Sequence, residues 1–122
     1  MRAIYVNPEE QTIDTVECDG TLEGIQKFVF PNGDSDGTCV TIACLRIRHP
    51  ITGENTLVDA WVDDEGLLKK NKLTRLDAYP TPLAGNILLL TTNDDGECTE
   101  IPEELVEFLK DSVTFTGMEL SV

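Results

Sequence analysis

The sequence is poor in the side chains that usually carry catalysis. It has one histidine, His49, which directly precedes Pro50 in a predicted turn. A nucleophilic triad needs a base that a third group orients, and nothing in the sequence places His49 beside a nucleophile. We interpret His49 as a solvated loop residue. The sequence also contains neither G-x-x-x-x-G-K-[ST] nor G-x-G-x-x-G, the glycine-rich motifs that bind phosphate groups. We therefore predict that the protein is not an enzyme.

Basic residues are scarce as well. Nine lysines and arginines stand against 23 acidic residues, which gives a formal net charge of −14. Nucleic-acid binding and docking on an anionic membrane both require clusters of lysine and arginine. We therefore expect no direct nucleic-acid contact and no membrane contact, and we expect a partner with a cationic protein surface. The alternative is that the acidity serves only solubility.

Cysteines are few and lack any C-x-x-C spacing: Cys18, Cys39, Cys44 and Cys98. No apolar run approaches the roughly 18 residues of a membrane span, and no secretory segment opens the chain. We therefore expect a cytoplasmic protein, in a host cell, with reduced thiols, three of them buried.

Motifs for metals and cofactors are incomplete. The cysteines and His49 are too scattered for a zinc site. The loop Asn32–Gly37 resembles the front of a calcium loop, but the position that needs a bidentate glutamate is Ala43. We expect no metal and no cofactor.

The hydrophobic patterns that are present predict a single α+β domain over residues 1–122, with a mostly antiparallel sheet of five to six strands and two helices. The predicted strands are Arg2–Val6, Thr12–Cys18, Thr38–Arg48, Thr56–Val62, Asn86–Thr92 and Val113–Met118. The predicted helices are Leu22–Val29, capped by Thr21 or Asp19, and Pro102–Lys110, with Pro102 as its first residue.

Two strands carry more specific expectations. Thr38–Arg48 is apolar on both faces in its first half, which predicts a central strand. The alternation in Thr12–Cys18 slips after Ile13, which indicates a bulge. The basic segment Lys69–Arg75 has no clean period and receives no element.

Four short motifs resemble a family of small, functionally uncharacterised proteins carried by phages, prophages and plasmids. They are Asp19–Phe28, Asp64–Leu68, Ala84–Leu90 and Ile101–Leu109. Members of that family typically have Asn-Arg after the middle turn, where this chain reads Lys70–Arg75. The resemblance implies a mobile-element origin and a small α+β domain, and it implies no functional residue.

The acidic residues therefore become the candidate site. Those we expect to contact a partner are Asp63, Asp64, Glu65, Asp94, Asp95, Glu103, Glu104 and Glu107. Ordered carboxylates can replace phosphates as partners of arginine and lysine. We predict a protein that inhibits a host defence complex, a CRISPR effector or a restriction enzyme, as a DNA mimic.

Three other functions stay open. One is a binder of a small nucleotide signal, which would have to meet Lys69, Lys70, Lys72 and Arg75. Another is a regulatory or structural module that acts by forming homo-oligomers. The third is a metal-dependent hydrolase, because carboxylates are plentiful.

Overall fold

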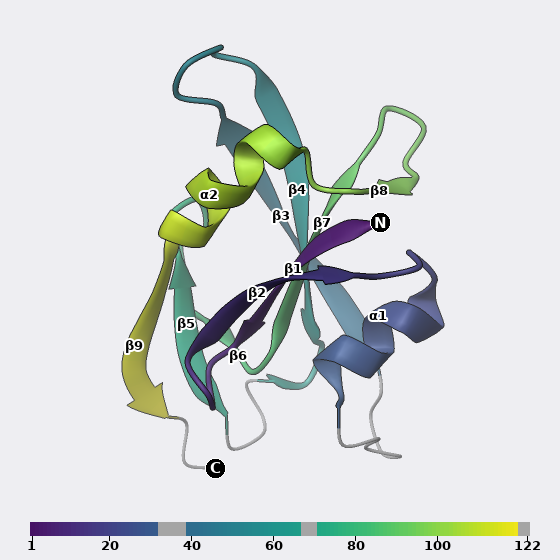
Figure 1. Cartoon of the computed structure of the whole chain (residues 1–122). Helices are drawn as coiled ribbons and strands as arrows, with labels where there is room; N and C mark the ends of the chain where they lie inside the picture. Colours follow the sequence, from purple (N-terminus) through teal and green to yellow (C-terminus); the bar gives the residue numbers. More distant parts are fainter. Residues whose placement is uncertain (32–38, 67–70, 120–122) are drawn as a thin grey trace.

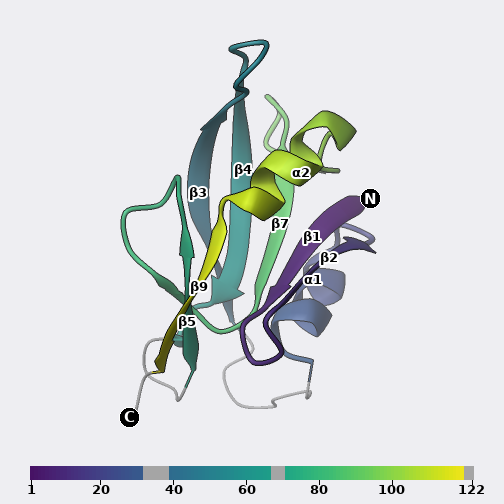
Figure 2. The same cartoon turned by 60° about the vertical axis from the view of Figure 1, so that its left-hand side comes forward.

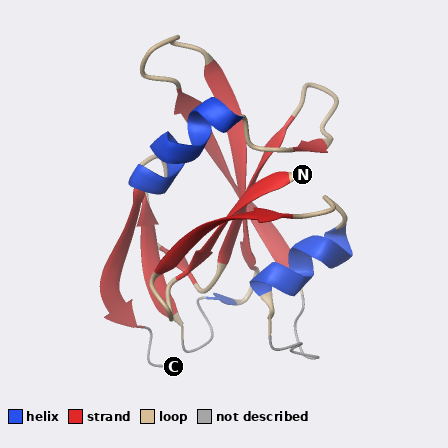
Figure 3. Cartoon of the chain, in the orientation of Figure 1, coloured by secondary structure: helices blue, strands red, loops and turns tan. Residues whose placement is uncertain are grey.

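A computed structural model describes residues 1–31, 39–66 and 71–119, which form two antiparallel sheets and two helices (Figures 1 and 3). The strands are β1 Arg2–Asn7, β2 Thr12–Glu17, β3 Val40–Arg48, β4 Asn55–Asp63, β5 Lys72–Leu76, β6 Leu83–Ala84, β7 Ile87–Thr92, β8 Cys98–Thr99 and β9 Val113–Glu119. The helices are α1 Leu22–Val29 and α2 Glu103–Asp111. The predicted α+β class is confirmed.

The larger sheet has six strands in the order β2-β1-β7-β4-β3, with β8 added beside the end of β7. Every neighbouring pair is antiparallel. The apolar run Ile87–Leu90 of β7 is fully buried, because side chains cover both faces of this strand. A continuous apolar run is what a strand covered on both faces requires.

The smaller sheet has the order β6-β5-β9. Its middle strand, β5, overlaps the basic segment Lys69–Arg75, for which no element was predicted. Leu73, Thr74 and Leu76 of β5 are all buried, so the strand does not alternate. β6 and β8 were also missed, since two residues are too few to show a pattern.

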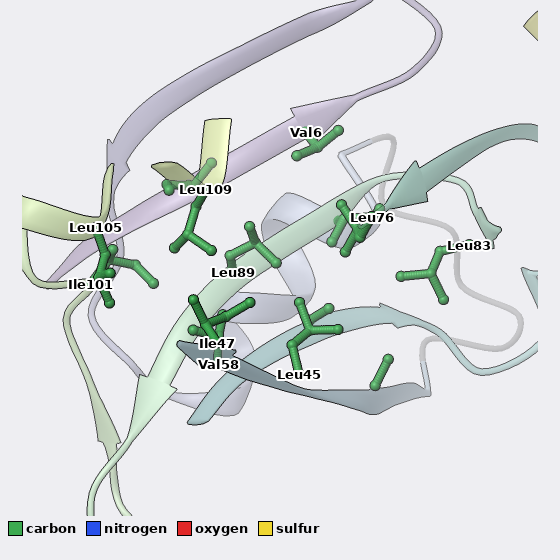
Figure 4. Close-up of a cluster of buried hydrophobic side chains, with 14 of the residues drawn as sticks. Val6, Leu45, Ile47, Val58, Leu76, Leu83, Leu89, Ile101, Leu105 and Leu109 are labelled. Carbon is green, nitrogen blue, oxygen red and sulfur yellow. The ribbon is translucent and has the colours of Figure 1, made fainter. Parts of the chain in front are cut away.

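Two apolar clusters lie on opposite faces of the larger sheet. One is the α2 face, where Leu105 and Leu109 of α2 pack with Leu89 and with the smaller sheet (Figure 4). The other is the α1 face, where Ile25 and Val29 of α1 pack on Leu88 and Leu90. Alternate side chains of β7 thus enter different cores, as the pleat of a strand requires.

α1 begins at its predicted residue and α2 begins close to its predicted residue. α1 has the predicted bounds, and Thr21 Oγ1 accepts a hydrogen bond from Gly24 N at 3.0 Å as its N-cap. α2 begins one residue later than predicted, with Pro102 at the cap position. Neither helix of the described residues is long and apolar enough to cross a membrane.

Three expectations are wrong. β3 is an edge strand and not a central one, because only β4 pairs with it. The β1–β2 register runs unbroken from Arg2–Glu17 to Asn7–Thr12, so no bulge follows Ile13. Of the four cysteines only Cys18 is buried. Cys39 directly precedes β3 and is exposed, Cys44 lies on the exposed face of β3, and Cys98 is partly buried. The loop Asn32–Gly37, which resembled part of a calcium site, lies outside the described residues.

Candidate partner-binding surface

The structure divides the eight predicted acidic residues between opposite ends of the larger sheet. Trp61 of β4 lies opposite Leu88 and Val58 lies opposite Thr91. By this register, Asp63–Glu65 is level with the start of β7, whereas Asp94 and Asp95 follow its end. Six residues of strand separate these points by about 20 Å. The eight residues therefore do not form one surface.

One of the two groups is a continuous acidic segment, Asp94–Glu107. It contains seven carboxylates and no lysine or arginine. Its carboxylates are all exposed: Asp94, Asp95, Glu97, Glu100, Glu103, Glu104 and Glu107. Figure 1 shows that the β7–β8 turn, β8 and the first turn of α2 lie at the same end of the molecule. Glu97 and Glu100 were missed by the sequence interpretation, which selected paired or helical acids and passed over single ones.

Hydrogen bonds fix the acidic segment at its beginning. Asn93 Oδ1 accepts from the backbone N–H of Asp95 at 3.0 Å and of Glu97 at 2.9 Å, which closes the turn. The buried hydroxyl of Thr91 then donates to the backbone oxygens of Thr99 and Glu100 at 3.0 and 2.8 Å. The carboxylates of this turn are therefore carried on an ordered backbone.

The middle of the segment is tied to the first strand. Ile101 N donates to Arg2 O at 2.8 Å, and Arg2 Nη1 donates to Ile101 O at 2.8 Å. Among the described residues, the ion pair that reaches the segment joins Arg2 and Glu100, with a nitrogen–oxygen distance of 4.0 Å. One partly exposed arginine leaves most of the negative charge of the segment unneutralised.

The three glutamates in the helical part of the segment differ in how their charge affects the stability of α2. Glu103 and Glu104 lie in the first turn of α2, where the helix dipole stabilises negative charge by about 0.3–1 kcal/mol each. Glu107 lies beyond the first turn and is spaced at i+4 and i+3 from these two residues. Like charges at that spacing repel by about 0.2–0.5 kcal/mol per pair. Local helix stability therefore accounts for Glu103 and Glu104 but less well for Glu107.

The second acidic group, Asp63–Glu65, has a local structural explanation. Asp63 Oδ1 accepts a hydrogen bond from Glu65 N at 2.9 Å, and Asp64 N donates to Cys39 O at 3.0 Å. These bonds close the turn that ends β4. An aspartate that accepts from the backbone two residues later is a common turn former.

The described basic residues of the alternative ligand site do not converge. Lys72 forms an ion pair with Glu9 at 3.7 Å, and Arg75 is exposed. Neither residue lines the cavity around Phe108, the one around Tyr79 or the one around Asp19. Lys69 and Lys70 lie outside the described residues.

These three cavities are also small, with volumes of about 250, 230 and 270 Å³. Pockets that bury a small molecule usually measure about 300–1,000 Å³. The largest is lined by Glu17, Cys18, Asp19, Gly24, Lys27 and Phe28. The geometry gives little support to a buried nucleotide ligand.

The histidine side chain takes part in a turn. His49 Nδ1 accepts hydrogen bonds from the backbone N–H of Ile51 at 3.1 Å and of Thr52 at 3.2 Å. It is half-buried in the β3–β4 hairpin, more enclosed than a solvated loop residue. Within the described residues, no three His, Cys, Asp or Glu side chains are grouped so that they could hold a metal ion.

One buried carboxylate was not foreseen. Asp59 of β4 is 8% exposed and accepts a hydrogen bond from the hydroxyl of Thr92. Burial, and then the nearby Asp59 and Cys18, raise the pKa of the Cys98 thiol, which keeps that thiol protonated. Asp59 lies within the predicted strand Thr56–Val62, and it lines none of the three cavities described above.

Comparison with known proteins identifies a family and nothing closer. A family model described as Domain of unknown function (DUF3846) matches residues 1–114. No curated protein and no solved structure matches the chain.

Proposed function

The chain belongs to the DUF3846 family, and we propose that it is a mobile-element protein that inhibits a host defence complex by occupying its cationic nucleic-acid-binding site. The proposed contact surface is the acidic segment Asp94–Glu107. The target class is a CRISPR effector or a restriction enzyme. The resemblance to phage-borne and plasmid-borne proteins supports the proposed origin.

One observation carries the proposal: the acidic segment displays seven exposed carboxylates and no basic residue on a hydrogen-bonded framework. Arginine and lysine bind carboxylates and phosphates through the same charge-assisted hydrogen bonds. A framework that is ordered before binding loses little conformational entropy when the partner docks. The segment is thus suited to replace a stretch of nucleic-acid backbone on a basic protein groove.

The test compares two triple variants that change the charge equally. Glu103→Gln, Glu104→Gln and Glu107→Gln neutralise three acids of the acidic segment. Asp63→Asn, Asp64→Asn and Glu65→Gln neutralise three acids at the other end of the sheet. The probe is a purified CRISPR effector or restriction enzyme, and the readouts are its affinity for the protein and its remaining DNA cleavage.

We expect the α2 triple variant to weaken binding about tenfold, because each exposed charge pair contributes roughly 0.2–1 kcal/mol. The control triple variant should bind the effector or restriction enzyme as tightly as the unmodified protein does. Added salt should weaken the binding of the control variant and of the unmodified protein alike. Equal losses in the two variants would assign the effect to overall charge. Affinity that does not change with ionic strength would contradict the electrostatic proposal.

A further inference from the structure

We propose that β3 pairs with β3 of a second copy of this chain, antiparallel and symmetric about Cys44, so that the larger sheet continues through a dimer. This inference does not depend on the proposed function. It rests on the free edge of β3, on its charge and on the residues that neighbour it in β4.

Two backbone hydrogen bonds show which groups of β3 face outward. Asp64 N donates to Cys39 O, and His49 N donates to Glu54 O, at 3.0 and 2.8 Å. Because antiparallel bonds alternate along a strand, odd-numbered residues from 39 to 49 face β4. The even-numbered residues direct their N–H and C=O groups away from it, and no described backbone group pairs with them: Val40, Ile42, Cys44, Arg46 and Arg48.

The edge is long and its side chains are exposed on the α1 face. β3 has nine residues, whereas proteins usually keep exposed edge strands short or cover them. Ile42 is 45% exposed, Cys44 is exposed, and the neighbouring Leu57 of β4 is 44% exposed. An unpaired ladder beside exposed apolar side chains is suited to pairing with another strand.

The charge of β3 favours its own copy as that strand. In a chain of net charge −14, β3 has two arginines and no carboxylate. An antiparallel pair centred on Cys44 places the basic half of one strand against the apolar half of the other. Arg46 then lies opposite Ile42 of the second copy, where its methylene chain can cover the exposed isoleucine.

The same register brings opposite charges together. Arg48 lies opposite Val40 of the second copy, and Val40 is paired with Asp63 on β4. Two strand spacings separate Arg48 from that Asp63 by about 10 Å, a distance that the two side chains can span together. The turn Asp63–Glu65, which follows β4, adds further acids at the same place.

The turn between β5 and β6 lies beside β3 (Figure 2), and it lines two cavities together with residues of β3, among them Ile42 and Arg46. Tyr79 and Leu83, which flank this turn, pack with Ala43 and Leu45 on the α2 face. Cys44 is paired with Asp59, which in turn is paired with Leu90 of the α1 face. The side chains of Ile42, Cys44 and Arg46 therefore point to the α1 face, opposite to the face on which Tyr79 and Leu83 pack.

The first test uses the two exposed cysteines of this region. The proposed register makes the two copies of Cys44 a directly opposed pair, with Cα atoms about 5.5 Å apart, a distance that a disulfide accommodates. The two copies of Cys39 would lie ten residues apart along the strands, about 34 Å. Mild copper–phenanthroline oxidation should cross-link Cys39→Ser, which keeps Cys44, into dimers. It should leave Cys44→Ser, which keeps Cys39, without a covalent cross-link between the two copies.

The second test uses no covalent bond. Ile42→Pro removes an N–H group that points away from β4, so the β4 ladder is preserved, and Ile42→Thr is its matched control with the N–H group intact. Sedimentation equilibrium should show a dimer. Its dissociation constant should be about tenfold or more higher for Ile42→Pro than for Ile42→Thr, because the substitution occurs in both copies and so removes two hydrogen bonds from the interface.

Three results would overturn the proposal. One is a monomer at every concentration, with the edge left for a different partner. Another is cross-linking through Cys39 as readily as through Cys44. The third is a dimer whose dissociation constant is the same for Ile42→Pro and for Ile42→Thr, since the interface of that dimer would lie elsewhere.

Discussion

At the scale of single residues, the start of α1 shows how one carboxylate organises a turn. Asp19 Oδ1 accepts hydrogen bonds from the N–H and the hydroxyl of Thr21 at 2.9 and 2.7 Å. Thr21 in turn caps the helix. Gly24 is needed beside them, because a Cβ atom at this position would collide with the Asp19 carboxylate. The glycine that weakens the helix by its own propensity thus makes room for the group that orders its start.

These hydrogen bonds predict a dependence of stability on pH. The side-chain and backbone bonds from Thr21 lower the pKa of Asp19 below its ordinary value of 3.8. A lowered pKa means that the ionised form stabilises the folded protein. The stabilisation is complete above pH 3.8 and is lost as the pH falls through the lowered pKa.

The change that tests it is Asp19→Asn. We expect the unfolding free energy of the unmodified protein to exceed that of Asp19→Asn near neutral pH, with a difference that shrinks as the pH falls below 3.8. Urea unfolding at a series of pH values measures this difference. Asp14→Asn, on an exposed side of β2, controls for the change in net charge. A difference that stays constant with pH would contradict the assigned hydrogen bonds.

At the scale of elements, β3 does not take the place in the sheet that its sequence indicates, whereas β7 does. The first half of β3 is apolar on both faces, which predicted a central strand, yet among the described strands only β4 pairs with it. β7 pairs with strands on both sides and is buried on both faces. The second apolar face of β3 is partly exposed, which supplies the surface for the proposed dimer.

This difference predicts unequal effects of the same truncation. Leu89 of β7 is 1% exposed, and Leu57 of β4 is 44% exposed. Leu89→Ala should lower the unfolding free energy by about 2–5 kcal/mol, as cavity-forming changes do. Leu57→Ala should lower it by less than about 1 kcal/mol. Urea unfolding at low protein concentration compares them, and equal losses would contradict the central place of β7.

At the scale of the whole molecule, the negative charge opposes folding. A net charge of −14 on 122 residues repels itself in the compact state, although it favours solubility. Fold and charge are therefore separable: the two apolar clusters hold the sheets and helices together, and the carboxylates remain at the surface.

Salt should consequently stabilise this protein. Raising the ionic strength from about 0.01 to 0.15 M shortens the screening length from about 30 to 8 Å. We expect Tm to rise by about 4 °C, which corresponds to roughly 1 kcal/mol for a domain of this size. Differential scanning calorimetry measures the shift. The Glu103→Gln, Glu104→Gln, Glu107→Gln variant should gain less, and a Tm that falls with salt would contradict self-repulsion.

The sequence by itself determined most of the local structure. The bounds of α1, Thr21 as one of its two candidate caps and the strand over residues 86–92 were predicted from local signals, and all three are confirmed. β5 was missed because Leu73, Thr74 and Leu76 are buried without alternation, and burial of that kind depends on what packs against the strand.

The tertiary structure alone decided which strand lies at the edge and which acids lie together. Asp63 and Asp94 have similar local sequences, but the antiparallel register of β4 and β7 sends them to opposite ends of the sheet. Strand order and register depend on contacts between residues that are distant in the chain. The spacing of hydrophobic residues along one strand carries no information about them.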